Sequence, residues 1–544
     1  MKYFLKMNSQ VISQLLSYCN TDQANIAPDH PIAKSARRPS GDTSSIAALN
    51  HIKSWISDCV GAHKACPGSD TTPPLPTRVI QIDGNHTNPH ARLIETSGLQ
   101  GIYACLSHCW GGSRAECITY KATLEANKAG IAWDKVPNTF QEAIRVASFL
   151  GISYLWIDSL CIIQDDVEDW MIEAAQMARI YQNAFITIAA TAARSSYAGL
   201  FRHTPDEFIA SSVSSATNGI PIFVRKALPH PRWDSTVEQE QYPLLDRAWV
   251  YQERLLSPRV IHFTETELVW ECRESERCEC QVGNAPSNDL AGDLDLAHVK
   301  MSWQDPKMWS NIVMHYSHLS LTFGKDKLPA LAGAAREVAN QQGSKLGTYL
   351  AGCWEHTLLI DLSWAIATFD APGRSDPWRA PTWSWMSVDC AIHPGMFPCT
   401  EITIIEASCE PSGRDPYGQI SSGHIVLRGC LLQTQLLYPS SESEAYRCFP
   451  FEIHDDELQL LKIKRIGLFP DYDITQPGRW QIPHQAMLSV LKLGHVVKGT
   501  HRCLVLRRLD TVEETYERVG YANLGVREVS DWYEGVQPST LRMV

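Results

Sequence analysis

The chain has 544 residues, which exceeds the usual size of one hydrophobic core and predicts two or three domains. Hydrophobic residues make up 44% and charged residues 20%, which excludes a fibrous or a wholly disordered chain. The formal net charge of −12 argues against a nucleic-acid partner, because phosphate backbones repel an acidic surface.

The sequence also argues against a membrane protein and against a disulfide framework. No stretch of about eighteen uninterrupted apolar residues occurs, so we expect no membrane span. Lys6 interrupts the short apolar run at the start, so we expect no signal peptide and a cytoplasmic location. In such a reducing compartment the 17 cysteines are expected to be free thiols, metal ligands or catalytic groups.

The N-terminal part of the chain precedes the first regular pattern. Residues 1–45 are predicted to be flexible, because most of this segment is polar and contains Pro and Gly. Residues 46–99 are expected to form a helical and extended region, with a short helix around 46–60.

Apolar runs and helical patterns then alternate between residues 100 and 191. The expected strands are 102–106, 154–158 and 185–191, and the expected helices between them are 139–150 and 167–182. Two consecutive strand–helix–strand crossovers predict a parallel sheet covered by helices, which is an α/β fold.

We assign residues 100–275 to this α/β domain and residues 276–400 to a helical linker region. Alternating runs such as 401–405 predict a mixed α/β region that is rich in strands over 401–544.

Polar residues follow the predicted parallel strands at the positions where those strands end. Ser107, His108, Trp110 and Gly111 come after the first strand, and Asp158 ends the second. Because ligands of open parallel sheets bind beyond the carboxyl ends of the strands, we interpret these residues as a candidate pocket. Within it, His108 and Asp158 are candidate catalytic groups.

Glu173 is a third candidate catalytic residue. Helical spacing places it beside Trp170, a candidate ligand-binding residue, on the face that should pack against the sheet. Desolvation there would tune the protonation of Glu173. The alternative is a structural acid that lies at the edge of the apolar stripe or pairs with a neighbouring arginine.

Arg247 and Glu253 belong to another dense polar group, with Trp249 and Gln252 between them. One interpretation is a ligand-binding helix that contributes Arg247 and Glu253 to the pocket. The other is a helix docked by Trp249 whose charged residues form ion pairs.

Cys59, His63 and Cys66 are spaced as metal ligands, since the first two lie one helical turn apart. A closed zinc site needs a fourth ligand, and the sequence shows none nearby. The cysteines at 272, 278 and 280 are candidates, but their spacing matches no standard zinc module. Reduced thiols without a metal are therefore the default interpretation.

Three blocks in this order resemble the conserved blocks of the fungal heterokaryon-incompatibility (HET) domain: YACLSHCWGG at 103–112, LWIDSLCIIQDDVEDWMIEAAQMARIYQNAFITIAAT at 155–191 and DRAWVYQERLLSPR at 246–259. Further motifs, such as PTWSW at 381–385, are similar to those of HET proteins of the stand-alone type.

The resemblance implies a cytoplasmic effector that triggers programmed cell death in fungal nonself recognition. It also implies a protein partner of the incompatibility type and allows for a homo-oligomer. HET-like chains are also encoded beside fungal secondary-metabolite genes, so an accessory or tailoring protein of such a cluster is a further alternative.

HET domains are likened to Toll/interleukin-receptor (TIR) domains, some of which cleave NAD with a glutamate. By that likeness Glu173 would stabilise the ribosyl cation as nicotinamide departs. NAD is then a candidate substrate, and the sequence indicates no certain cofactor. Trp170 and Glu173 are three residues apart, whereas the TIR pattern has four.

Overall fold

We describe the chain from a computed structural model. The described residues are 15–19, 38–68, 72–112, 115–213, 222–226, 228–230, 241–280, 303–367, 373–436, 438, 449–452, 467–497, 500–509, 514–525 and 532–544. They fall into two compact units, residues 1–301 and residues 302–544, here called the first and second unit. Most of the segment 1–45, which we expected to be flexible, lies outside the described residues.

The first unit is built on an eight-stranded sheet with the order β11-β10-β9-β6-β4-β5-β2-β3. The four central strands β5, β4, β6 and β9 are parallel, and antiparallel strands flank them on both sides. The strand bounds are β2 (Arg78–Asn85), β3 (Asn88–Glu95), β4 (Tyr103–Ser107), β5 (Tyr154–Trp156), β6 (Ile186–Ala189), β9 (Arg259–Phe263), β10 (Leu268–Cys272) and β11 (Glu276–Cys278). The predicted α/β class with a parallel sheet is confirmed.

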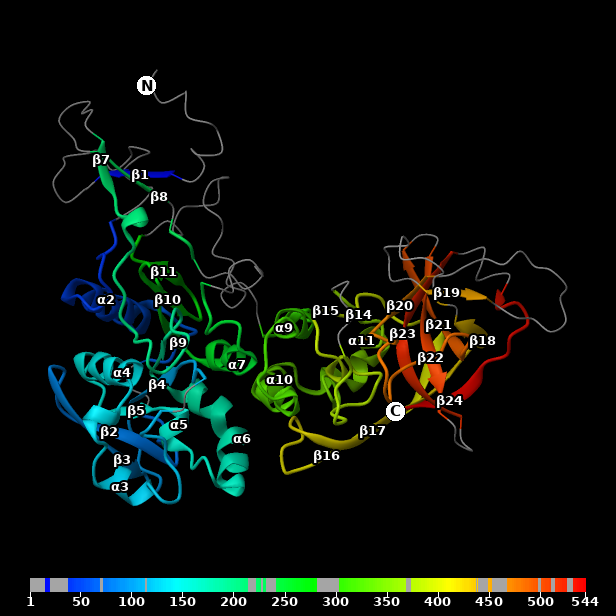
Figure 1. Cartoon of the computed structure of the whole chain (residues 1–544), viewed down its shortest axis with the longest axis horizontal. Helices are drawn as coiled ribbons and strands as arrows, with labels where there is room; N and C mark the ends of the chain where they lie inside the picture. The colour runs from blue at the N-terminus through cyan, green and yellow to red at the C-terminus, as the bar shows by residue number, and fades with distance from the viewer. Residues whose placement is uncertain are drawn as a thin grey trace. The chain divides into compact units, whose positions relative to one another are not determined.

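The two crossover helices lie where the sequence periodicity predicts them. They are α4 (Asn138–Phe149), which buries Phe140 and Ile144, and α6 (Val167–Asn183), whose first turn is capped by the Asp166 side chain. Figure 1 shows α4 on one side of the strands and α6 on the other, as expected because the two crossovers step in opposite directions along the sheet.

The described residues of the first unit also form further helices and a smaller sheet. The helices are α2 (Ile46–Ala62), α3 (Leu124–Ala129), α5 (Asp158–Cys161) and α7 (Ala248–Leu256). A separate three-stranded sheet consists of β1 (Leu15–Cys19), β8 (Ile222–Lys226) and β7 (Ser211–Val213).

In its described residues the second unit combines α-helices with a large sheet, and its richness in strands confirms the prediction from the alternating runs. Its helices are α9 (Met308–Tyr316), α10 (Pro329–Gln342) and α11 (Leu358–Asp361). The nine strands of the large sheet are β16 (Ile402–Pro411), β17 (Ile420–Gly429), β18 (Leu431–Leu436), β19 (Phe449–Glu452), β20 (Gly467–Pro470), β21 (Met487–Val497), β22 (Thr500–Arg508), β23 (Thr515–Gly525) and β24 (Ser539–Met543). Because β22 also pairs with β23, the strands from β23 through β20 to β22 close on themselves around an apolar core.

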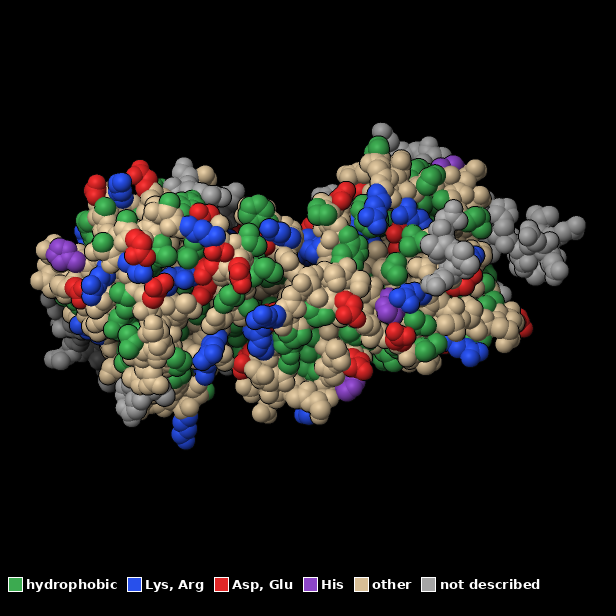
Figure 2. All heavy atoms as spheres, turned by 90° about the horizontal axis from the view of Figure 1, so that it is seen from below, with side chains coloured by type: hydrophobic (Ala, Val, Ile, Leu, Met, Phe, Trp, Pro, Cys, Tyr) green, Lys and Arg blue, Asp and Glu red, His purple; other side chains and the backbone are tan. Residues whose placement is uncertain are grey.

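The described surface carries charges of both signs. Figure 2 shows one face on which acidic and basic side chains are interspersed rather than gathered by sign. Among the described residues, no helix combines the length and the apolar character that crossing a bilayer requires.

Candidate functional site

The parallel pairing of β4 with its neighbours brings the predicted strand-end residues together. Ser107 is the last residue of β4 and pairs with Ala189 at the end of β6. Asp158 follows β5 by two residues and begins the short helix α5, rather than ending the strand as we expected. Ser107, His108 and Asp158 thus lie at the same edge of the sheet.

Asp158 links His108 to Trp110. Its Oδ2 accepts a 2.8 Å hydrogen bond from Trp110 Nε1, and its Oδ1 lies 3.8 Å from His108 Nδ1. Burial lowers the pKa of His108 to about 4, although the nearby Asp158 carboxylate partly opposes this shift. The ring of His108 packs edge-on against Phe140 of α4, and Nε2 has no hydrogen-bond partner among the described residues. At neutral pH the imidazole is therefore uncharged.

Ser107 and Glu253 form the second half of this polar network. Ser107 Oγ donates a 2.6 Å hydrogen bond to Glu253 Oε2, and both side chains are buried. Burial raises the pKa of Glu253 to about 7; the Ser107 hydrogen bond opposes the rise and the Asp158 charge adds to it. A buried carboxyl that titrates near pH 7 beside a hydroxyl can accept or release a proton under physiological conditions.

Arg247 joins the network through the backbone, because its Nη1 donates a 2.8 Å hydrogen bond to the carbonyl oxygen of His108. It is the N-cap residue of α7, the helix that carries Glu253. We call the set Ser107, His108, Trp110, Asp158, Arg247 and Glu253 the strand-end network.

Gly111 has a steric role beside this network. Its φ of +78° favours glycine, and a Cβ at this position would lie 2.4 Å from the Ser195 side chain. Glycine here allows the loop after β4 to approach the loop after β6.

The contacts of Glu173 are with residues outside the strand-end network. Its side chain is buried, its Oε1 lies 3.9 Å from Arg78 Nη2, and it forms a hydrogen bond with the Thr77 side chain. Arg78 also binds both carboxylate oxygens of Asp169 at 2.6 Å. The arginine pairing that we considered as the alternative for Glu173 is therefore present. Its neighbour Trp170 is half-buried against the core of the first unit.

Sequence reasoning missed Thr77 and Arg78, which precede and begin β2. No local pattern connects them to α6, because roughly ninety residues separate Arg78 from Asp169. Only the position of β2 next to β5 brings the two elements together.

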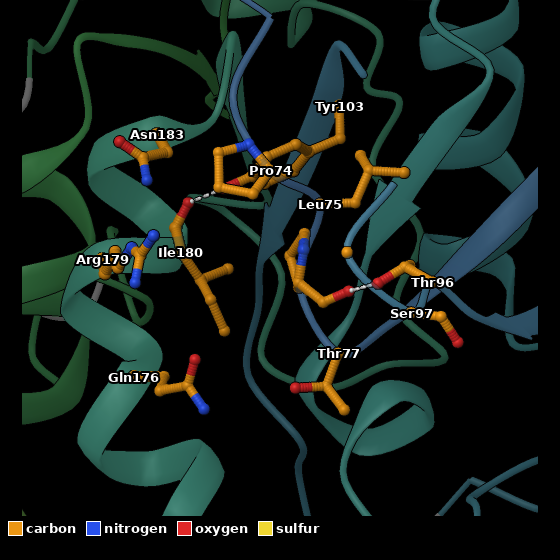
Figure 3. Close-up of a pocket in the computed structure, with 12 residues that line it drawn as sticks. Pro74, Leu75, Thr77, Thr96, Ser97, Tyr103, Gln176, Arg179, Ile180 and Asn183 are labelled. Carbon is orange, nitrogen blue, oxygen red and sulfur yellow. Dashed lines mark hydrogen bonds between the residues drawn. The ribbon is translucent and has the colours of Figure 1, made fainter. Parts of the chain in front are cut away.

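Two cavities lie at the other ends of the parallel strands. One has a volume of about 310 Å³ and is lined by Tyr103 at the start of β4 and by side chains of α6. Figure 3 shows Gln176 and Arg179 of α6 on one side of it and Thr77 on the other. The second, of about 380 Å³, is lined by Ile102, Phe185 and Arg259, among others. Neither cavity is lined by residues of the strand-end network.

The possible metal ligands that the sequence suggested do lie close together. The structure brings Cys59, His63 and Cys66 together and adds Cys272, so that four ligand atoms all lie within 4.8 Å of one another. The fourth ligand that the local sequence did not reveal therefore comes from β10.

Comparison with known proteins identifies one domain. The family model described as heterokaryon incompatibility protein (HET) matches residues 103–253, within the span 100–275 that we assigned to the α/β domain. No curated protein and no solved structure matches the chain significantly. The match begins at β4 and ends at Glu253, so it includes every residue of the strand-end network. Residues 103–253 of this chain are therefore a HET domain.

Proposed function

We propose that the chain is a HET effector that triggers incompatibility-type cell death in a fungal cytoplasm after it engages a protein partner. The observation that carries this proposal is the strand-end network, which joins residues from all three HET blocks. A network that links three separate segments of one domain makes their relative positions interdependent.

The network favours a signalling role over open catalysis. Ser107, His108 and Glu253 are almost fully buried, and the Asp158 side chain is only 22% exposed. Groups that are closed to solvent can hold one conformation of the domain until binding changes it. This supports an effector whose active arrangement depends on the network.

Inducible expression in a filamentous fungus tests the proposal. We expect growth arrest and uptake of a vital dye with the wild-type chain and a loss of both with Glu253→Gln. Glu168→Gln is the matched control, because Glu168 is an exposed acid on α6 outside the network. Immunoblots must show equal protein levels for the comparison.

Normal growth at high levels of the wild-type chain would argue against a death effector. Equal killing by wild type and Glu253→Gln would instead show that the domain acts without an intact strand-end network. The proposal would then lose the observation that supports it.

A second candidate function is cleavage of NAD, and one observation favours it. Glu173 has a raised pKa because it is buried, and its partner Thr77 lines the cavity of about 310 Å³ beside Gln176 and Arg179. An arginine and amide groups that line a cavity can bind the phosphate groups of a ligand, and a carboxylate close to the same cavity can act on that ligand.

Release of nicotinamide from NAD by the purified full chain tests this candidate. We expect release that Glu173→Gln abolishes and Glu168→Gln preserves. The absence of release by the wild type, or equal release by both variants, would reject it.

A further inference from the structure

We infer that the first unit binds a zinc ion through Cys59, His63, Cys66 and Cys272, and that this ion fastens helix α2 to the sheet. The four residues come from two regions that are distant in sequence. Cys59 and His63 lie one turn apart at the end of α2, Cys66 lies in the bend that follows the helix, and Cys272 is the last residue of β10.

The distances between the ligand atoms fit a tetrahedral zinc ion. Cys272 Sγ lies 3.3 Å and Cys66 Sγ 3.9 Å from His63 Nδ1, and all four ligand atoms are within 4.8 Å of one another. Zinc–sulfur bonds of about 2.3 Å and zinc–nitrogen bonds of about 2.0 Å would give a tetrahedron with edges of roughly 3.5 to 3.8 Å. The side chains therefore need only small movements to enclose the ion.

The surroundings also suit this ion. The three cysteines are buried, and two polar groups reach their sulfur atoms: Arg259 Nε lies 3.3 Å from Cys59 Sγ, and Ser275 Oγ lies 3.4 Å from Cys272 Sγ. Three thiolates and Zn²⁺ leave one negative charge, which the Arg259 guanidinium offsets. Soft sulfur ligands with one imidazole select zinc over magnesium and calcium, which prefer oxygen.

A second cluster independently has the composition of a metal site. His230, Glu267, Cys278 and Cys280 also place four ligand atoms within 4.8 Å of one another. Cys280 Sγ lies 3.1 Å from Cys278 Sγ and 3.3 Å from His230 Nε2, and Glu267 Oε1 lies 3.0 Å from the same nitrogen.

The Glu267 carboxylate is held in an orientation that suits a metal ligand. Its side chain is fully buried, and its Oε2 accepts a 2.7 Å hydrogen bond from the backbone N–H of Cys280. That hydrogen bond orients Oε1 toward His230 and the two thiols, as outer-shell contacts orient the ligands of metal sites. Two thiolates, one imidazole and one carboxylate are all zinc ligands.

The metal content of the purified full chain tests both sites. After dialysis against metal-free buffer, we expect mass spectrometry to find about two zinc ions per chain. Cys272→Ser should remove the first ion and Cys280→Ser the second, each leaving about one, and the double variant should retain almost none.

Cys117→Ser is the matched control. Cys117 is also a buried thiol of the first unit, and it belongs to neither cluster, so this variant should keep the wild-type zinc content. A wild-type chain without zinc, or equal content in the control and both cluster variants, would overturn the inference.

X-ray absorption at the zinc edge of the wild-type chain gives an answer that does not depend on how the variants fold. We expect about five sulfur and three nitrogen or oxygen ligands for every two ions. A shell made only of nitrogen and oxygen would mean that zinc binds elsewhere on the surface and would overturn both sites.

Discussion

Asp471 in the second unit and Glu253 in the first are both buried acids, but their charges are balanced in different ways. In the second unit Arg518 donates hydrogen bonds to both carboxylate oxygens of Asp471, at 2.7 and 3.1 Å, and to the carbonyl oxygens of Leu362 and Trp364. In the first unit Glu253 accepts a hydrogen bond from the neutral hydroxyl of Ser107, and the like charge of Asp158 helps to raise its pKa.

The difference separates a structural from a responsive arrangement. A buried acid that meets its counter-ion directly holds the elements of the two partners together, and breaking the pair is costly. A buried acid with a neutral partner keeps its proton to a higher pH, so that its charge depends on conditions near neutrality. We therefore expect substitutions of the Arg518–Asp471 pair to change stability, and substitutions in the strand-end network to change how stability depends on pH.

The largest effect is expected from Arg518→Met. This change removes the guanidinium that donates to both oxygens of the fully buried Asp471 carboxylate and leaves only Arg374, 4.0 Å away, as a counter-ion. The loss should cost about 3 kcal/mol of the free energy of unfolding, at the lower end of the range for a broken buried pair. Hydrogen exchange of the amides of β23, measured in the full chain, reports this loss in the second unit. Unchanged protection of β23 would show that Arg518 is dispensable there.

The next effect concerns pH, because Glu253 and His108 act in opposite directions. The pKa of Glu253 is raised from 4.5 to about 7, so the folded chain binds the extra proton between these values and stability falls as pH rises. The pKa of His108 is lowered from 6.5 to about 4, so the unfolded chain binds the extra proton in that window and stability rises with pH. Each contribution amounts to about 3 kcal/mol, so they nearly cancel.

Two variants separate the opposing contributions. Relative to wild type, Glu253→Gln should gain about 3 kcal/mol of stability as the pH increases from 4.5 to 7, and His108→Phe should lose a similar amount between pH 4 and 6.5. Denaturant unfolding at a series of pH values, compared with wild type at each pH, measures both. Parallel pH profiles for all three proteins would contradict the assigned shifts.

Ser107→Ala should have a smaller effect. It removes the hydroxyl that donates to Glu253 and leaves a buried carboxyl oxygen without that partner, at a cost of about 1 to 3 kcal/mol. Because the hydrogen bond favours the charged form, the pKa of Glu253 should rise further and the loss should shrink at low pH. Unfolding at pH 5 and pH 8 tests this: an equal loss at both values would show that the hydroxyl does not act through the charge.

The smallest effect is expected from Arg508→Met. Arg508 pairs with Glu514 at 2.6 Å, but both side chains are 53% exposed, so solvent screens the pair and its loss should cost no more than about 1 kcal/mol. It is also the matched control for Arg518→Met, since both substitutions remove an arginine from an ion pair in the second unit. A loss as large as that of Arg518→Met would remove the distinction between exposed and buried pairs.

The sequence alone determined the local elements and the edge of the sheet at which polar residues meet. Helical and strand periodicities are local, so they predicted α4 and α6 within one or two residues of their observed ends. The alternation of strands and helices implied parallel pairing, and parallel pairing alone brings Ser107 and Asp158 to one edge.

Only the tertiary structure decided which side chains meet across distant segments. Glu173 lies beside Arg78, and Cys272 reaches His63 from 209 residues away, because β2 and β10 take particular places in the sheet. A periodic pattern records which face of an element is buried, but it does not record the neighbour that covers that face. Order and register of the strands are set by the packing of the whole domain, so the partner of a buried charge or thiol cannot be predicted from local spacing.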